Sequence, residues 1–348
     1  MKILVSALEH SANVHLKSLK NELSEEIEFV GIFDKELGEP IVDLRSLAVM
    51  GFVDAIMKLR FFFKLNSQMV KLAADVDKVL LIDSSGFNLP LAKKIKKLYP
   101  NKEIIYYILP QAWAWRKSRI PVLEQTVDKL CSILPFEKDY YSVVAQIEYV
   151  GHPLLDQITK FKTELNEKIE NVLFMPGSRR AEISKLMPIY RKLRGFLNVN
   201  AILIIPNIFS KEEINELYGD ISGFEVRDDA HKEMFEADFG FICSGTATLE
   251  ASLIGIPFIL SYIAKPVDYF IVSKLAKIEK VGLGNIMFLK YKGREMHPEF
   301  LQEDVTVENL LKSYKDYNRE KFLLDSKELR KYLKHGSAKR MAEILEST

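Results

Sequence analysis

Short apolar runs alternate with longer amphipathic stretches along most of the chain, and the two spacings predict strands and helices in turn. In the first half, stretches of helical spacing such as 14–23 and 89–98 separate the apolar runs. The strands predicted here are Lys2–Ser6, Glu28–Ile32, Lys78–Ile82, Glu103–Ile108, Lys129–Ile133 and Glu148–Val150. Such regular alternation predicts a parallel, doubly wound α/β sheet.

The alternation pauses at 154–171, a polar stretch rich in Lys and Glu that reads as a helix or linker, and then restarts. The later strands are predicted at Val172–Met175, Ala201–Pro206, Gly223–Val226, Phe239–Cys243 and Pro257–Leu260, whereas 305–345 is charged and helical. We therefore expect two Rossmann-like domains, 1–160 and 161–320, with a cleft between them. A helical segment, 321–348, is expected to pack back on the first domain or on a partner subunit.

Composition excludes several classes of protein. The chain has 348 residues, 48% hydrophobic and 28% charged, and a net charge of +1, which is typical of a soluble globular protein and gives no indication of nucleic acid as a partner. Cys131 and Cys243 lie in apolar runs, so we expect buried thiols in a reducing compartment. No secretory signal, no membrane-spanning run and no zinc site is expected.

Two turns in the second half follow predicted strands and lead into predicted helices. They contain Gly177, Ser178 and Arg179 in one case and Ser244, Gly245 and Thr246 in the other, and Glu182 and Glu250 lie in the helices that follow. Glycine permits a sharp turn and close approach of a ligand, and the free N–H groups of a helix start favour an anion.

The pair of turns therefore predicts a nucleotide site. Arg179 or Arg180 would pair with phosphate, and a helix-start Glu would accept hydrogen bonds from a ribose. Neither glycine is followed by the Gly-Lys-Ser/Thr of a P-loop. Taken singly, each turn would be ordinary loop chemistry with a helix cap.

Polar residues also follow three predicted strands of the first half, at 6–13, 82–88 and 109–116. Asp83 is our candidate general base, because partial burial at a strand end would raise its pKa. Its alternative role is that of a helix cap. His10 is a second possible base, although a lone loop histidine is more often a surface residue.

The segment 47–64 is dense in large apolar residues, and Phe52, Ile56, Leu59 and Phe63 share one helical face. Lys58, Arg60 and Lys64 interrupt it. The pattern fits either a core helix or an interfacial segment that contacts lipid or an acyl chain, with its cations near lipid phosphates.

These residues match the motifs of a known family. The matching stretches are Leu47–Gly51, Ile82-Asp83 with Phe87-Asn88, Trp113-Ala114-Trp115-Arg116, Pro135-Phe136-Glu137, Gly151-His152-Pro153, Pro176–Arg179 with Glu182, Ser244–Ala247 with Leu249-Glu250, and Asn285. Over nearly its whole length the chain resembles the lipid-A-disaccharide synthase family, glycosyltransferases of lipopolysaccharide assembly.

The resemblance implies a GT-B fold and an inverting transfer from UDP-2,3-diacylglucosamine to 2,3-diacylglucosamine 1-phosphate. The products are the β-1,6-linked disaccharide 1-phosphate and UDP, and neither a metal nor a cofactor is needed. It implies a peripheral location on the cytoplasmic face of the inner membrane and allows a homodimer. The implied roles are catalysis for Asp83 and Glu9, donor binding for Gly177, Ser178, Arg179, Glu182, Ser244, Gly245, Thr246, Glu250 and Asn285, acceptor or loop contacts for Ser11, Asn88, Trp115 and Arg116, and acyl or membrane contacts for Phe52, Ile56 and Phe63.

The chain departs from the family pattern in two loops. The first loop of the family reads Gly-Glu-x-Ser-Gly-Asp, and here it reads Leu8-Glu9-His10-Ser11-Ala12-Asn13. Gly86 replaces a second acid, which leaves Asp83 as the only acid of its loop.

Two alternatives to the synthase reading remain. One is another GT-B enzyme that uses UDP-N-acetylglucosamine, either a lipid-II-type transferase or a 2-epimerase. The other is a non-catalytic protein that binds lipid or nucleotide.

Overall fold

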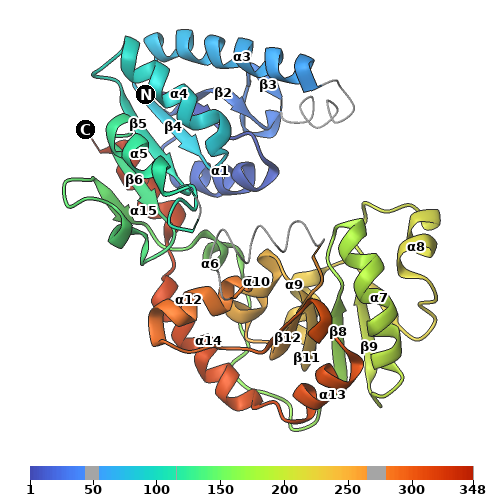
Figure 1. Ribbon diagram of the computed structural model, residues 1–348. Coiled ribbons are helices and arrows are strands. Elements are labelled where there is room, and N and C mark those ends of the chain that lie inside the picture. Colours follow the sequence, from blue (N-terminus) through green and yellow to red (C-terminus); the bar gives the residue numbers. More distant parts are fainter. Residues whose placement is uncertain (44–54, 115, 265–279, 348) are drawn as a thin grey trace. The chain divides into compact units, whose positions relative to one another are not determined.

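The computed structural model describes residues 1–43, 55–114, 116–264 and 280–347 (Figure 1). The chain divides into two units, each described here by itself. The first unit comprises Met1–Asp156 together with Leu333–Thr348, and the second comprises Gln157–Tyr332.

The first unit is built on a seven-stranded parallel sheet in the order β3-β2-β1-β4-β5-β6-β7. The strands are β1 (Lys2–Ser6), β2 (Glu28–Phe33), β3 (Val42–Asp43), β4 (Lys78–Ile82), β5 (Glu103–Tyr107), β6 (Lys129–Ser132) and β7 (Ile147–Tyr149). The helices are α1 (His10–Glu22), α3 (Ala55–Leu72), α4 (Ser85–Leu98), α5 (Ile120–Thr126), α6 (Pro153–Gln157) and α15 (Ser337–Glu346). Short 3₁₀ turns are η1 (Lys35–Leu37), η3 (Ala73–Asp75), η4 (Lys117–Arg119) and η5 (Glu137–Tyr140).

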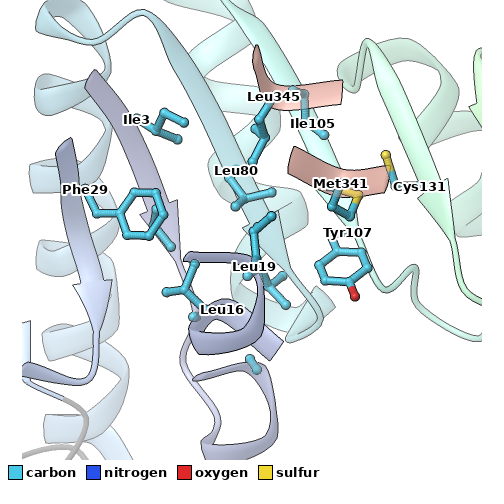
Figure 2. Packing of buried hydrophobic residues seen from close by; sticks show 14 of the residues in the cluster. Ile3, Leu16, Leu19, Phe29, Leu80, Ile105, Tyr107, Cys131, Met341 and Leu345 are labelled. Carbon is cyan, nitrogen blue, oxygen red and sulfur yellow. The ribbon is translucent and has the colours of Figure 1, made fainter. Parts of the chain in front are cut away.

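Helices cover both faces of this sheet, so the side chains that alternate between the two sides of each strand are buried on either side. Ile3, Leu80 and Ile105 face α1 and α15, whereas their neighbours Leu4 and Leu81 face α3, α4 and α5. The last helix therefore belongs to the core of the first unit, and its red ribbon lies among the blue and green elements in Figure 1. Figure 2 shows its side chains Met341 and Leu345 beside Ile105, Leu80, Tyr107 and Cys131.

The second unit repeats the plan with a six-stranded parallel sheet in the order β10-β9-β8-β11-β12-β13. Its strands are β8 (Asn171–Met175), β9 (Asn200–Ile204), β10 (Glu225–Arg227), β11 (Phe239–Cys243), β12 (Phe258–Tyr262) and β13 (Glu299–Leu301). Its helices are α7 (Arg180–Arg194), α8 (Lys211–Tyr218), α9 (Ala230–Glu236), α10 (Thr246–Ile254), α12 (Leu283–Lys292), α13 (Val307–Lys315) and α14 (Arg319–Leu333), and η6 spans Gln302–Asp304.

Aromatic packing fills one face of the second sheet. Phe174 of β8 stacks on Phe241 of β11 with ring centroids 5.3 Å apart, and Tyr190 of α7 covers both rings. Helices α7, α8 and α13 contribute to this core. On the other face α10 packs against α9 and α12.

The doubly wound architecture predicted from the alternation is confirmed in both units. The sequence missed β3 and β13, which are edge strands of two and three residues. The two residues of β3 are too few to show a strand period. β13 is as long as β7 and β10, which were predicted, but its Glu299-Phe300-Leu301 is not part of a longer apolar run. In the stretch 154–171 the structure has the short helix α6 at the start and the first residue of β8 at the end. Both cysteines are buried free thiols.

Candidate functional site

In each sheet the strand order reverses at one point, called the topological switch point. Ligands of open α/β sheets bind at this point, outside the carboxyl ends of the strands. In the second unit this switch point lies between β8 and β11, which pair in parallel with Met175 opposite Ile242. The Gly177 and Gly245 turns leave these two strands. The topology thus brings together two motifs that lie 68 residues apart in sequence, as the difference between positions 245 and 177.

The turn after β8 requires glycine at position 177. Its φ is +99°, and an added Cβ would lie 2.6 Å from Oε2 of Glu182. Glu182 is buried in the first turn of α7, and its Oε1 pairs with Nη1 of Arg179 at 2.9 Å. Glu182 holds the guanidinium of Arg179 in place through this pair. The Arg179 side chain is nevertheless 78% exposed, so the rest of the guanidinium is accessible to solvent.

The neighbouring Arg180 forms ion pairs with two glutamates of α8. Its Nη1 lies 2.5 Å from Glu213 and its Nη2 lies 2.9 Å from Glu216, both on α8. Of the two arginines that the sequence left open, Arg180 is therefore engaged by α8, whereas Arg179 pairs with Glu182 and stays largely exposed.

The turn after β11 is open. At Gly245 no described atom lies within 4 Å of the position that a Cβ would occupy. Helix α10 starts at Thr246 without a side-chain cap, and α7 likewise starts without one. Uncapped first-turn N–H groups and the positive end of a helix dipole both favour an anion. Ser178 and Thr246 are both exposed beside these starts.

Glu250 lies farther along α10, where it meets a residue that sequence reasoning missed. Nε2 of His231, in the first turn of α9, lies 3.3 Å from Oε2 of Glu250. The hydrogen bond to Glu250 raises the pKa of His231, against the opposing effect of burial. A lone histidine gives no sequence signal for this pairing.

Asn285 is fully buried, and its side chain is satisfied inside the protein. Its Nδ2 donates to Oε1 of Glu299 at 2.8 Å and to the carbonyl of His297 at 2.8 Å, and its Oδ1 accepts from the backbone N–H groups of Met296 and His297. Glu299 in turn accepts from the backbone N–H groups of Val281 and Gly282 at 2.9 and 3.1 Å. Asn285 therefore holds the turn that begins α12. No sequence signal identified Glu299, because it lies on an unpredicted edge strand.

In the first unit the switch point lies between β1 and β4, and Asp83 follows β4 directly. Asp83 and Ser84 both adopt left-handed backbone angles, with φ of 49° and 40°. Such strain persists only where the surroundings fix it. The carbonyl of Asp83 accepts from Oη of Tyr106 at 2.5 Å and from Nδ2 of Asn88 at 2.9 Å.

The electrostatic setting of Asp83 suits a base. Burial raises the pKa of its carboxyl above the ordinary value, the negative charge of Glu9 raises it further, and a hydrogen bond from the Ser84 backbone opposes both effects. Glu9 accepts from Oγ of Ser84 at 3.0 Å. The loops after β1 and β4 thus place the two carboxyl groups named from the sequence close together.

Asn88 lies beneath this loop. It is fully buried, accepts from Oγ of Ser6 at 2.6 Å and donates to the carbonyls of Ile82 and Asp83. Its polar atoms therefore fix the strand ends that support Asp83.

The altered first loop has its own internal support. Nδ2 of Asn13 donates to the carbonyls of Ala7 and Glu9 at 2.9 Å each, and its Oδ1 accepts from the backbone N–H of Asp34 at 2.7 Å. A carboxylate in this position would have no hydrogen to donate. Asn13 thus organises the loop that carries Glu9, while Ser11 and His10 are exposed at the start of α1.

The loop after β5 carries Trp113 and Arg116. Trp113 packs edge-on against Phe136 with ring centroids 5.0 Å apart, and Arg116 is exposed with a left-handed φ of 49°. Trp115 lies outside the described residues.

The apolar segment is described only in part. Phe52 lies outside the described residues, and the Ile56 side chain within α3 does too. Phe63 is 60% exposed, and Nζ of Lys94 on α4 lies 6.0 Å from its ring centroid. Leu65 and Met69 of the same helix are buried, so α3 presents one face to the core and leaves Phe63 outside.

None of the described helices is both long and apolar enough to cross a bilayer. Nor do the described His, Cys, Asp and Glu side chains form a group of three or more that could hold a metal ion.

Comparison with known proteins identifies the family of this chain. The family model described as lipid-A-disaccharide synthetase matches residues 3–346. A lipid-A-disaccharide synthase of Helicobacter pylori is 48% identical over 353 residues, which cover 98% of this chain and 96% of the relative. The resemblance to the lipid-A-disaccharide synthase family that the motifs indicated is therefore confirmed.

Solved structures share the fold at low identity. MurG of Acinetobacter baumannii matches with a TM-score of 0.62 and 14% identity, covering 99% of both chains. A UDP-GlcNAc 2-epimerase of Neisseria meningitidis, bound to UDP-GlcNAc, matches with a TM-score of 0.63 and 11% identity over 99% of both chains. The GT-B fold is thus confirmed, and fold alone does not separate a transferase from an epimerase. The family match does, and this chain belongs to the lipid-A-disaccharide synthetase family of glycosyltransferases.

Proposed function

We propose that the chain transfers 2,3-diacylglucosamine from its UDP derivative to 2,3-diacylglucosamine 1-phosphate, forming the β-1,6-linked disaccharide 1-phosphate and releasing UDP. The enzyme class follows from the family, and the identity of the two acylated sugars is the proposal. The observation that carries it is the pair of uncapped helix starts beside Arg179 in a chain of this family.

The donor diphosphate would lie at the β8–β11 switch point. The first-turn N–H groups of α7 and α10 and the guanidinium of Arg179 would stabilise the negative charge that develops on UDP as the sugar–phosphate bond breaks. Glu250 would accept hydrogen bonds from the ribose, with His231 holding its carboxylate. Because Asn285 is buried and satisfied, its role would be to position the turn before α12 rather than to touch the donor.

Asp83 would act as the general base. In this role its carboxylate removes the proton from the acceptor's 6-hydroxyl as that oxygen attacks the anomeric carbon, and UDP leaves from the opposite face with inversion. A raised pKa makes Asp83 a stronger base than an ordinary carboxylate. Glu9 would contribute by its charge.

The test is turnover with both acylated sugars, followed by UDP release and by mass detection of the disaccharide. Asp83→Ala should lower kcat at least 100-fold while UDP affinity stays near wild type, because the base does not bind the donor. Gly86→Ala, one residue into α4 with no described atom near its added Cβ, is the matched control and should retain activity. Near-normal turnover of Asp83→Ala would move the base to Glu9 or His10.

The same assay separates the alternatives. A 2-epimerase would convert a soluble UDP-sugar without any lipid, and a binding protein would release no UDP. Activity that survives EDTA supports the metal-free reaction, whereas loss of activity restored by Mg²⁺ would refute it.

We also propose that the protein works at the cytoplasmic face of the inner membrane. Both substrates carry acyl chains, and the exposed Phe63 lies beside Lys64 and Lys94 on α3 and α4. An exposed aromatic group next to cations suits the interface of an anionic bilayer.

A further inference from the structure

The strand order places opposite charges on the two sides of Asp83. Strand β4, which Asp83 follows, lies between β1 and β5 in the sheet. Glu9 follows β1 and accepts a hydrogen bond from Oγ of Ser84, so the acidic neighbour lies on one side. On the other side the loop after β5 carries three cations, Arg116, Lys117 and Arg119. A negatively charged part of a substrate bound beside Asp83 is therefore repelled on the β1 side and attracted on the β5 side.

Arg119 is bonded directly to the Asp83 loop. Its Nη1 donates to Oγ of Ser85 at 2.6 Å, and Ser85 lies shortly after Asp83 at the start of α4. Arg119 is half-buried, and this hydroxyl is the only side-chain partner that it has among the described residues. A guanidinium presents several N–H donors in one planar fork. A single neutral hydroxyl therefore leaves the charge of Arg119 and most of its donors unmatched beside Asp83.

The turn that carries Arg119 begins with a strained residue. Arg116 is exposed and has a left-handed φ of 49°, and its carbonyl accepts from the backbone N–H of Arg119 at 2.9 Å. A left-handed conformation is unfavourable for a residue with a side chain, and such strain is concentrated at ligand-binding sites. Lys117 is directed to another loop, because its Nζ lies 6.0 Å from the ring centroid of Tyr140. The turn thus brings Arg116 and Arg119 together and leaves these two arginines for a ligand.

Resting on the function proposed above, we propose that the Arg116–Arg119 turn is the subsite for the anomeric phosphate of the acceptor, with Arg119 as the residue that binds it. In 2,3-diacylglucosamine 1-phosphate the anomeric carbon and the carbon that bears the 6-hydroxymethyl group are both bonded to the ring oxygen. The phosphate and the 6-hydroxyl therefore lie along the same edge of the sugar, and a base at Asp83 requires a phosphate subsite next to it. Arg119 has this position through its bond to Ser85, and a planar guanidinium suits paired hydrogen bonds to phosphate.

Such a subsite would let the protein select its acceptor by charge. A phosphate monoester carries a charge of about −1.5 to −2 at pH 7, whereas an unphosphorylated diacylglucosamine carries a neutral hydroxyl at the same carbon. Arg119 would stabilise the first and gain nothing from the second. The preference for a phosphorylated acceptor is therefore the property that tests the proposal.

The first experiment measures binding without turnover. Equilibrium dialysis compares short-chain 2,3-diacylglucosamine 1-phosphate with the same compound lacking phosphate, and UDP is present to occupy the donor site. Wild type should bind the phosphorylated compound at least about tenfold more tightly, as expected for a hydrogen bond to a charged group. Arg119→Gln should lose about tenfold in affinity for the phosphorylated compound and keep its affinity for the other. Arg119→Lys, which retains the charge but not the planar fork, should lie between the two.

Two control variants separate phosphate binding from attachment of the loop and from the general field of the turn. Ser85→Ala removes the hydrogen bond to Arg119 but leaves the cation, so the preference for phosphate should fall by no more than about threefold. Lys117→Ala removes one charge from the same turn, and its preference should also stay within about threefold of wild type. If Ser85→Ala reproduced the full loss seen in Arg119→Gln, Arg119 would only attach the loop, and the phosphate subsite would be overturned.

Turnover and vesicle binding distinguish the remaining outcomes. In the disaccharide assay Arg119→Gln should raise the KM for the acceptor about tenfold and leave the KM for the donor near wild type. No disaccharide formation by wild type, together with phosphate-selective binding that Arg119→Gln loses, would refute the proposed reaction and leave the subsite standing. Equal affinity of wild type for the two compounds, or an equal loss for both in Arg119→Gln, would overturn the subsite. So would weaker sedimentation of Arg119→Gln with phosphatidylglycerol vesicles at an unchanged preference for phosphate, because the arginine would then bind a lipid headgroup.

Discussion

Replacing Arg179 by alanine should weaken UDP binding by about tenfold. A hydrogen bond to a charged group contributes roughly 1.5–3 kcal/mol. Because the side chain is 78% exposed, solvent screens its charge, and we expect the lower end of that range. About 1.5 kcal/mol corresponds to roughly a tenfold change in Kd.

Arg180→Ala is the matched control, one residue away and with the same loss of charge. Arg180 is held by Glu213 and Glu216 of α8, so its removal should leave the Kd for UDP within about twofold. It should cost less than about 1 kcal/mol of stability, as expected for half-exposed ion pairs.

Calorimetric titration with UDP at low and at physiological salt measures both variants. The Arg179 effect should shrink at the higher salt, because part of it is electrostatic. In Arg179→Ala the buried Glu182 loses its ion-pair partner. Melting temperatures of the variants check that this loss does not unfold the second unit. An equal loss of affinity in both variants, or a loss confined to Arg180→Ala, would refute the assignment of the diphosphate to Arg179.

Three further outcomes follow from the same geometry. Gly177→Ala should destabilise the fold by about 1–3 kcal/mol in a melting experiment, because it adds a Cβ at positive φ against Glu182; a neutral result would mean that the turn relaxes freely. Glu9→Gln removes a negative charge that raises the pKa of Asp83, and a base must be deprotonated to act. The acidic limb of the pH–rate profile should therefore move to lower pH, and an unmoved limb would dissociate Glu9 from the base. Phe63→Ser should melt like wild type but sediment less with anionic vesicles, because this side chain is exposed; unfolding would instead place Phe63 in the core.

The spacing of hydrophobic residues along the sequence was sufficient to predict the α/β architecture of this chain. Alternation of apolar runs with helical spacing is a property of neighbouring residues, and it predicted both sheets together with the positions of Asp83, Gly177 and Gly245 at strand ends. Burial of Cys131 and Cys243 followed from their apolar neighbours. The edge strand β3 was missed because its two residues show no period, and β13 was missed because it is not part of a longer apolar run.

The partners of individual side chains depended on tertiary structure. The residue types and spacing alone left Arg179 and Arg180 open, although the family motif ends at Arg179. Helix α8, more than thirty positions away in this chain, engages Arg180 and leaves Arg179 open. Asn285 matches a family motif, yet its neighbours bury and satisfy it.

The burial of Glu137 likewise depended on the tertiary structure. A glutamate after a strand is ordinarily expected at the surface, yet in the fold Glu137 is buried and its carboxyl accepts a hydrogen bond from Ser132. Sequence thus determined where chain segments run, because helix and strand spacing are encoded locally. The tertiary structure decided which charges are paired, exposed or buried, because desolvation and pairing depend on residues that the fold brings from elsewhere in the chain.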